Sequence, residues 1–262
     1  LLVFMLRAAD PASGLVTAAL FGCIVLFAAA YPRAAIAFGI VTGILTQGVF
    51  RQTVPVFSDR NFFGVVRVTE RQAQDAGANV YTLREIAHGT TLHGVQVTAP
   101  DSLRTTPTAY FHAQSPIAEV INRFAPAEVA VVGLGAGTLA CHQAPGRKFT
   151  FFEIDPAVIR IADEYFSFLS DCPGAAPHTI IEADGRLGIA AAHTAFYDLI
   201  VLDAFSSDTM PAHLMTVEAL RVYLSRLNAG GMIAMNISSR YFDIAPVVAA
   251  TAAEAGMFAL HK

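Results

Sequence analysis

The sequence predicts an α/β fold with a doubly wound, mostly parallel sheet, preceded by a small antiparallel β meander and an apolar helical hairpin. Three observations predict it. Apolar strand-like runs alternate with helical segments in the second half of the chain. Before them, apolar and polar residues alternate with a period of two, and the first 50 residues are nearly uncharged. We therefore expect three parts. They are transmembrane helices that end a longer membrane region (1–50), the meander (51–106), and an α/β domain that is C-terminally incomplete (107–262).

The composition excludes some classes of partner. Hydrophobic residues make up 54% of the 262 residues and charged residues 15%, with a mean hydropathy of +0.50, whereas soluble domains carry about 25% charged residues. The net charge of −4 gives no indication of a basic surface for nucleic acid. The three cysteines, Cys23, Cys141 and Cys172, lack the spacing of a metal or redox site. We expect buried or incidental thiols and no bound metal.

Two uncharged runs of 17 residues, Leu15–Tyr31 and Ala34–Phe50, are separated only by a proline and an arginine. A helix needs about 17–25 apolar residues to span a bilayer, so the pair predicts a transmembrane hairpin. Two buried core helices are the alternative. Arginines flank the hairpin mainly on one side, at Arg7, Arg51, Arg60 and Arg67. The positive-inside rule then places everything after residue 50 in the cytoplasm.

Residues 51–106 change to an alternation of apolar and polar residues, which is typical of strands. Three short strands are expected, at Gly64–Thr69, Asn79–Leu83 and Val95–Thr98. A helix with proline in its first turn is expected from Ser115 to about Phe124. It leads into the α/β domain.

The first strand of that domain, Val129–Val132, is followed by glycines at alternate positions and then by helical sequence. A second strand, Phe149–Ile154, has Glu153 near its end, 20 residues after Gly133. Glycines let the backbone approach a ligand closely, and an acid about 20 residues further on can bind two ribose hydroxyls. The pattern predicts a nucleotide crevice at the carboxyl edge of a parallel sheet.

Further strands are expected at His178–Ala183, Tyr197–Leu202 and Met232–Ile237, with another beginning at Met257–Leu260. The first two of them run into Asp184 and Asp203. Asp155 is expected to be a helix N-cap, because Pro156 follows it at the first helical position. Helices are expected over Ala157–Phe168, Ala190–Ala192, Pro211–Leu227 and Asp243–Ala255, and Asn228–Gly231 is expected to form a turn.

Six motifs in order suggest a family: HGTTLHGVQ, PTAYFH, VGLGAG, FFEID, EADGR and YDLIVLDAFSSD. They resemble the class I S-adenosylmethionine-dependent, Rossmann-like fold and, within it, the spermidine synthases, which are polyamine aminopropyltransferases. The resemblance extends from about Asn61 to the C-terminus. The sequence is similar in particular to bacterial membrane proteins that carry a spermidine-synthase-like domain behind transmembrane helices. The resemblance implies a multi-pass protein of the bacterial inner membrane.

The resemblance implies roles for residues on the donor side of the crevice. Glu153 would bind both ribose hydroxyls, and Asp184, with Gly185 beside it, would meet the adenine amino group. The alternatives are a solvated strand-end acid for Glu153 and a turn acid for Asp184. The glycines that would lie against the methionine-like part of the ligand are Gly133, Gly135 and Gly137.

On the acceptor side, Asp203 matches the family's catalytic acid, and Gln96 and Tyr110 would line the amine pocket. Spermidine synthases generally place a second aspartate three residues after the first, but here the next acid is Asp208. Asp208 would contact the amine or belong to a turn. The alternatives for Asp203 are a helix N-cap and a plain methyltransferase pocket residue. For Gln96 and Tyr110 they are strand polarity and hairpin packing. His112 and His213 are expected to be ordinary loop or helix residues.

The resemblance implies decarboxylated S-adenosylmethionine or S-adenosylmethionine as co-substrate, a polyamine as the second substrate, and no metal. It is also compatible with a homodimer. A methyltransferase that uses S-adenosylmethionine would share every donor-side residue and is the first alternative. A non-catalytic membrane domain that binds polyamine or nucleoside is the second.

Overall fold

The computed structural model describes residues 55–89, 91–172, 178–205, 210–239 and 242–261. The transmembrane hairpin expected over residues 1–50 lies outside these ranges. Within them, no helix combines the length and the apolar character that crossing a bilayer requires. The division of the remaining chain into 51–106 and 107–262 stays a prediction.

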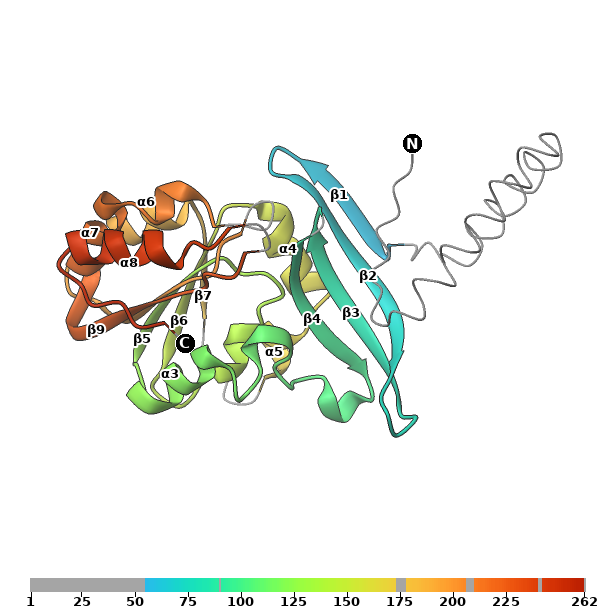
Figure 1. Ribbon diagram of the computed structural model, residues 1–262. Helices are drawn as coiled ribbons and strands as arrows, with labels where there is room; N and C mark the ends of the chain where they lie inside the picture. The colour runs from blue at the N-terminus through green and yellow to red at the C-terminus, as the bar shows by residue number, and fades with distance from the viewer. Residues whose placement is uncertain (1–54, 90, 173–177, 206–209, 240–241, 262) are drawn as a thin grey trace, which may run out of the picture. The chain divides into compact units, whose positions relative to one another are not determined.

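Four antiparallel strands form the first sheet, in the order β1-β2-β3-β4 (Figure 1). They are β1 (Phe57–Asn61), β2 (Gly64–Gln74), β3 (Val80–His88) and β4 (Thr91–Ala99). The sheet has one strand more than the three expected, and its strands are longer. Cross-strand charge pairs extend them past the apolar residues, since Glu70 lies opposite Arg84 and accepts from it at 2.6 Å.

Five parallel strands form the second sheet, in the order β7-β6-β5-β8-β9. They are β5 (Glu128–Val132), β6 (Lys148–Glu153), β7 (Thr179–Glu182), β8 (Tyr197–Leu202) and β9 (Leu227–Met235). Alternate residues of one strand enter different cores. Val129 and Val131 belong to one buried cluster, whereas Ala130 and Val132 belong to another. Both faces are therefore covered, which explains why these strands are apolar throughout.

Helices cover both faces of the parallel sheet (Figure 1). One buried cluster contains residues of α3 (Pro116–Phe124), α4 (Pro156–Glu164) and α5 (Phe168–Asp171). The other contains residues of α6 (Gly185–Ala191), α7 (Val217–Arg226) and α8 (Ala245–Glu254). The doubly wound arrangement that the sequence predicts is confirmed. The helix start at Ser115 is confirmed too, because its side chain accepts a hydrogen bond from the Ala118 N–H.

Several expected elements differ. The glycine turn leads into a 3-10 helix, η3 (Thr138–His142), and Pro145 and Gly146 follow too soon for a full helix. The helix expected over Ala157–Phe168 ends early, since α4 stops at Glu164 and α5 begins only at Phe168. The helix expected over 211–227 begins as a 3-10 turn, η4 (Ala212–Leu214), because Thr216 caps a new helix. The expected turn at 228–231 lies inside β9, and no strand begins at 257 within the described residues.

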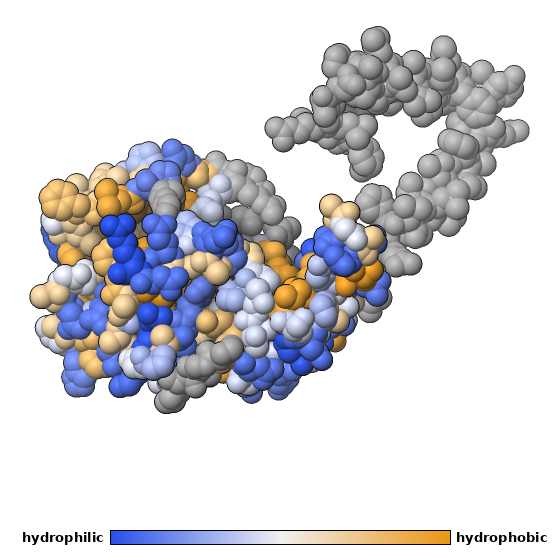
Figure 2. Space-filling view, turned by 90° about the horizontal axis from the view of Figure 1, so that it is seen from below, coloured by the Kyte–Doolittle hydropathy of each residue, from blue (hydrophilic) through white to orange (hydrophobic). Residues whose placement is uncertain are grey.

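The antiparallel sheet is fixed against α4 and the parallel sheet. Val66, Val68 and Ile86 share a buried cluster with β5 and β6. Arg160 of α4 forms an ion pair with Asp59 at 2.8 Å. On the face of the molecule shown in Figure 2, hydrophilic and hydrophobic residues are mixed over the described part. Such a mixture is ordinary for the surface of a globular protein.

Cys141 of η3 and Cys172, which follows α5, form a disulfide with their Cα atoms 5.0 Å apart. The expectation of incidental thiols is wrong for these two. Their separation of 31 residues hides the pairing in the sequence. Close packing of η3 on α5 brings them together, because Gly137 lies directly against Leu169.

Candidate active site

Four strand ends meet along the carboxyl edge of the parallel sheet. The backbone N–H of Gly133 donates to Phe152, that of Asp203 to Val132, and that of Asn236 to Leu202, each at 2.9 Å. These bonds continue the ladders one residue past β5, β8 and β9. The residues that follow neighbouring strands are therefore adjacent, and open α/β sheets bind their ligands at this edge.

The glycine turn after β5 is tightly enclosed. Gly133 has φ +97°, and a Cβ at this position would lie 2.6 Å from the carbonyl oxygen of Asp203. Gly135 has φ +55°, and a Cβ there would collide with the carbonyl oxygen of His93 on β4. Only glycine fits at both positions, because a side chain would meet backbone and the φ values favour glycine. The turn thus lies directly beside the catalytic candidate Asp203.

Glu153, the last residue of β6, holds the glycine turn from the other side. Its carboxylate accepts from the Leu134 N–H at 3.0 Å and from the Asp155 N–H at 2.9 Å. The side chain is buried, and burial raises its pKa against the two backbone hydrogen bonds. A buried carboxylate oriented by two N–H groups keeps further lone pairs for ligand hydroxyls.

Asp155 caps α4, as the sequence predicts, by accepting from the Ala157 N–H at 2.9 Å. The same oxygen accepts from Asn61 Nδ2 at 2.6 Å, across 94 residues of sequence. Asn61 in turn accepts from the Phe63 N–H at 2.9 Å in the β1–β2 turn. The antiparallel sheet therefore reaches the acid loop that follows β6.

Asp184 caps α6, because its Oδ1 accepts from the Leu187 N–H at 2.9 Å. Its Oδ2 lies 3.0 Å from His213 Nε2 of η4. Gly185 follows it, and a side chain there would collide with Val132 of β5. The adenine contact expected of Asp184 and Gly185 stays a prediction, and both residues also have structural roles.

Asp203 follows β8 and is half-buried. Asn236 Nδ2 donates to its Oδ1 at 2.7 Å. Burial raises the pKa of Asp203 to about 7, against this opposing hydrogen bond. Desolvation and then the charge of Asp203 raise the pKa of Tyr110, so the phenol and the carboxyl group interact. Tyr110 thus lies within electrostatic range of Asp203, a carboxyl group whose pKa suits proton transfer near neutral pH.

Gln96, which was expected to line the amine pocket, makes its side-chain hydrogen bonds within the protein. Its amide is buried, donating to the Arg104 carbonyl and to Ser167 Oγ at 2.9 Å each, and accepting from the Ser167 N–H. These bonds hold β4 to the segment before α5. Its role in substrate binding stays a prediction, and so does that of Asp208, which lies outside the described residues.

Asn61, Asn236 and His213 were not expected at the site. Asn236 follows a strand end directly, so the rule that selected Asp203 could have found it. Asn61 and His213 have no such signal, because each reaches an acid from a distant part of the chain.

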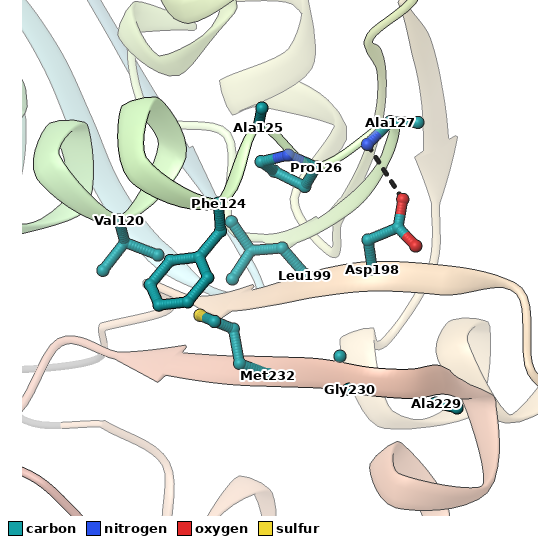
Figure 3. Close-up of a pocket in the computed structure, with 11 residues that line it drawn as sticks. Val120, Phe124, Ala125, Pro126, Ala127, Asp198, Leu199, Ala229, Gly230 and Met232 are labelled. Carbon is teal, nitrogen blue, oxygen red and sulfur yellow. Dashed lines mark hydrogen bonds between the residues drawn. The ribbon is translucent and has the colours of Figure 1, made fainter.

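A cavity of about 310 Å³ lies at the opposite edge of the sheet, where β8 begins (Figure 3). Apolar side chains such as Phe124, Leu199 and Met232 line it, and Asp198 accepts there from the Ala127 N–H. None of the sequence-predicted site residues borders this cavity. We place the candidate site at the carboxyl edge, because the strand-end acids and the glycine turn lie there.

No protein-family model matches the chain. It is 32% identical over 111 residues to a probable polyamine aminopropyl transferase of Bifidobacterium longum, covering 41% of this chain and 23% of that protein. It is 34% identical over 125 residues to a polyamine aminopropyltransferase of Vibrio vulnificus, covering 45% and 40%. A weaker match, 31% over 131 residues, is to a eEF1A lysine and N-terminal methyltransferase of Xenopus laevis, covering 45% and 18%.

The chain thus spans less than half the length of these relatives. Among solved structures, a probable spermidine synthase of Corynebacterium glutamicum superposes with a TM-score of 0.51 at 20% identity, over 70% of this chain and 64% of that one. That likeness concerns the fold. The chain therefore has a spermidine-synthase-like form of the S-adenosylmethionine-dependent transferase fold.

Proposed function

We propose that this chain transfers an aminopropyl group from decarboxylated S-adenosylmethionine to an amine of a polyamine. The observation that supports this most is the half-buried Asp203 carboxyl group at the strand edge, with Asn236 donating to it and Tyr110 within electrostatic range. Such a group can hold a cationic amine and then accept its proton. The relatives named as aminopropyltransferases agree with this assignment.

The donor side fits an adenosyl sulfonium. The backbone of the glycine turn leaves no room for side chains next to Asp203, so a ligand would meet backbone there. Glu153 offers a buried carboxylate for the ribose hydroxyls, and Asp184 an acceptor for an amino group of the base. No group of three or more metal-ligating side chains is found in the described residues. The proposed reaction needs none.

The chemistry is an in-line displacement. The amine arrives protonated and gives its proton to Asp203 Oδ. The neutral nitrogen then attacks the carbon next to the sulfonium, a C–N bond forms, and the C–S bond breaks with its electrons going to sulfur. The products are a longer polyamine and methylthioadenosine. Most of the acceleration would come from orienting the two reactants, because the sulfonium is already a good leaving group.

A methyltransferase is the second candidate, because one relative carries that name and because the acid expected three residues after Asp203 is absent. It would use S-adenosylmethionine itself. The deciding experiment incubates purified protein with either co-substrate and a polyamine panel. Release of methylthioadenosine only with the decarboxylated compound supports the proposal. Tighter calorimetric binding of S-adenosylmethionine, with no methylthioadenosine released, would favour the methyltransferase.

We further propose that residues 1–50 anchor the chain in a membrane, since the two uncharged runs of 17 residues have the length for it. The full chain should sediment with membranes, resist an alkaline wash and dissolve in detergent. Recovery in the supernatant after the alkaline wash would contradict the anchor. It would leave the proposed transfer reaction untouched.

A further inference from the structure

His213 makes a contact that the proposed reaction does not explain. It lies on η4, 29 residues after Asp184, and its Nε2 is 3.0 Å from Asp184 Oδ2. A second hydrogen bond lies nearby, because Arg186 Nη1 donates to the His213 carbonyl oxygen at 3.4 Å. The two bonds join η4 to the start of α6. The imidazole remains 52% exposed, so burial does not account for its position.

The pair fixes the Asp184 carboxylate on both sides. Its Oδ1 accepts from the Leu187 N–H, and its Oδ2 faces His213. An aspartate side chain turns easily about its last torsion when only one oxygen is held. With both oxygens held, the unused lone pairs point in set directions. Asp184 therefore offers a ligand acceptors of fixed orientation.

Such acceptors distinguish between purine bases. A 6-aminopurine presents N–H donors at its exocyclic position, whereas a 6-oxopurine presents an oxygen that a carboxylate repels. A site whose polar group loses its partner with the wrong ligand discriminates strongly. Discrimination falls if the carboxylate is free to turn away, because the 6-aminopurine then loses its oriented acceptor.

We propose that His213 is a positioning residue that sets the preference of the nucleoside site for 6-aminopurine over 6-oxopurine bases by holding Asp184. This inference rests on the proposed function, which places the adenine at Asp184. A nearby observation agrees with it. The Tyr223 hydroxyl is buried and has no hydrogen-bond partner within the described residues, and burial and then the Asp184 charge raise its pKa. The charge of Asp184 thus acts on the region between α6, η4 and α7.

The test measures binding of methylthioadenosine and methylthioinosine to the full chain by calorimetry. We expect wild type to prefer the adenosine compound. His213→Ala should weaken it about tenfold, as expected for loss of a hydrogen bond to a charged group, and change the inosine compound less than about twofold. His213→Gln, which keeps an N–H donor, should restore most of the preference. His193→Ala removes an exposed histidine before β8 and is the matched control.

An equal loss for both nucleosides in His213→Ala would overturn the inference and leave a packing role. No loss for either would overturn it as well. Thermal unfolding of each variant, compared with wild type, establishes that the protein is folded. If wild type binds neither nucleoside, the proposed function itself fails. If it binds the adenosine compound and His213→Ala keeps the full preference, only the role of His213 fails.

Discussion

Replacing Asp203 with asparagine removes the proposed proton acceptor and changes little else. The asparagine has the same shape, and its Oδ1 can still accept from Asn236, which donates at 2.7 Å. Backbone contacts of the glycine turn are unaffected, because Gly133 meets the carbonyl oxygen of residue 203 rather than its side chain. The variant therefore separates chemistry from the shape of the site.

The expected loss in kcat is about 10²–10⁴-fold, as for other positioned acid–base groups, or about 2.7–5.4 kcal/mol of barrier. The pH dependence follows from the pKa of about 7. Only the ionised carboxylate accepts a proton, so about half of the wild-type protein is active at pH 7 and about a tenth at pH 6. Wild-type kcat/KM should thus rise about tenfold per pH unit below 7 and level off above it. The pKa of Tyr110 is raised, so its phenol does not titrate in this range.

The assay follows methylthioadenosine release between pH 5 and 9, with methylthioadenosine binding measured in parallel. Asp203→Asn should lose the inflection near pH 7 and bind the nucleoside within about twofold of wild type. If the inflection persists in the variant, another group accepts the proton. If nucleoside binding falls as far as the rate, Asp203 shapes the donor site and the assignment as base is wrong.

Stability provides a separate check on the same pKa. The folded-state pKa of about 7 lies above the ordinary aspartate pKa of 3.8. The folded protein therefore binds the proton more tightly, and this contribution to stability is lost as the pH rises from about 4 to about 7. Asparagine cannot ionise, so the melting temperature of Asp203→Asn relative to wild type should be higher at pH 8 than at pH 4. A difference that does not change with pH would contradict the raised pKa.

Three further predictions concern residues other than Asp203. Gly133→Ala should destabilise the fold by about 2–4 kcal/mol and abolish nucleoside binding. The control is Gly146→Ala, at φ +83° with open space around it, which should cost about 1–2 kcal/mol and leave binding intact. Equal effects of the two variants would show that backbone strain alone matters. Glu153→Gln should weaken methylthioadenosine at least about tenfold, because its amide would point a donor at a backbone N–H; unchanged calorimetry would remove Glu153 from the site. Cys141→Ser breaks the disulfide to Cys172, which closes a loop of 31 residues. Measured without reductant, this variant should have a free energy of unfolding about 3–4 kcal/mol below that of wild type. Identical denaturant midpoints would mean that the two sulfurs are not bonded in solution.

Much of the parallel-sheet domain could be predicted because its strands are buried on both faces. Such strands appear as short apolar runs, and β8 has the same bounds as the run Tyr197–Leu202. β1 could not be predicted, since FSDRN lacks an apolar alternation and owes its conformation to pairing with β2. The missing helix after the glycine turn has a similar cause. Tertiary packing of η3 on α5 and a nearby proline override the local pattern there.

Site residues divide in the same way. Glu153 ends β6 and Asp203 follows β8, so the topology of a parallel sheet alone brings them to one edge. Gln96 was expected to line the amine pocket from its motif, and that role stays a prediction. The motif gave no sign of its hydrogen bonds to Arg104 and Ser167. The difference is physical: a strand-end position is determined by the sheet, whereas the direction of a side chain inside a hairpin depends on which polar partners are near.

The antiparallel sheet is more than an appendage to the parallel sheet, because two of its contacts hold the glycine turn and the loop after Glu153. The carbonyl oxygen of His93 on β4 lies so close to Gly135 that no side chain fits between them. Asn61 donates to Asp155, whose own N–H orients Glu153. The glycine turn and the Glu153 loop are thus each contacted by a strand that precedes the parallel sheet in the chain. The proposed transfer relies on orienting its reactants, so we expect it to require the antiparallel sheet as well as the parallel one.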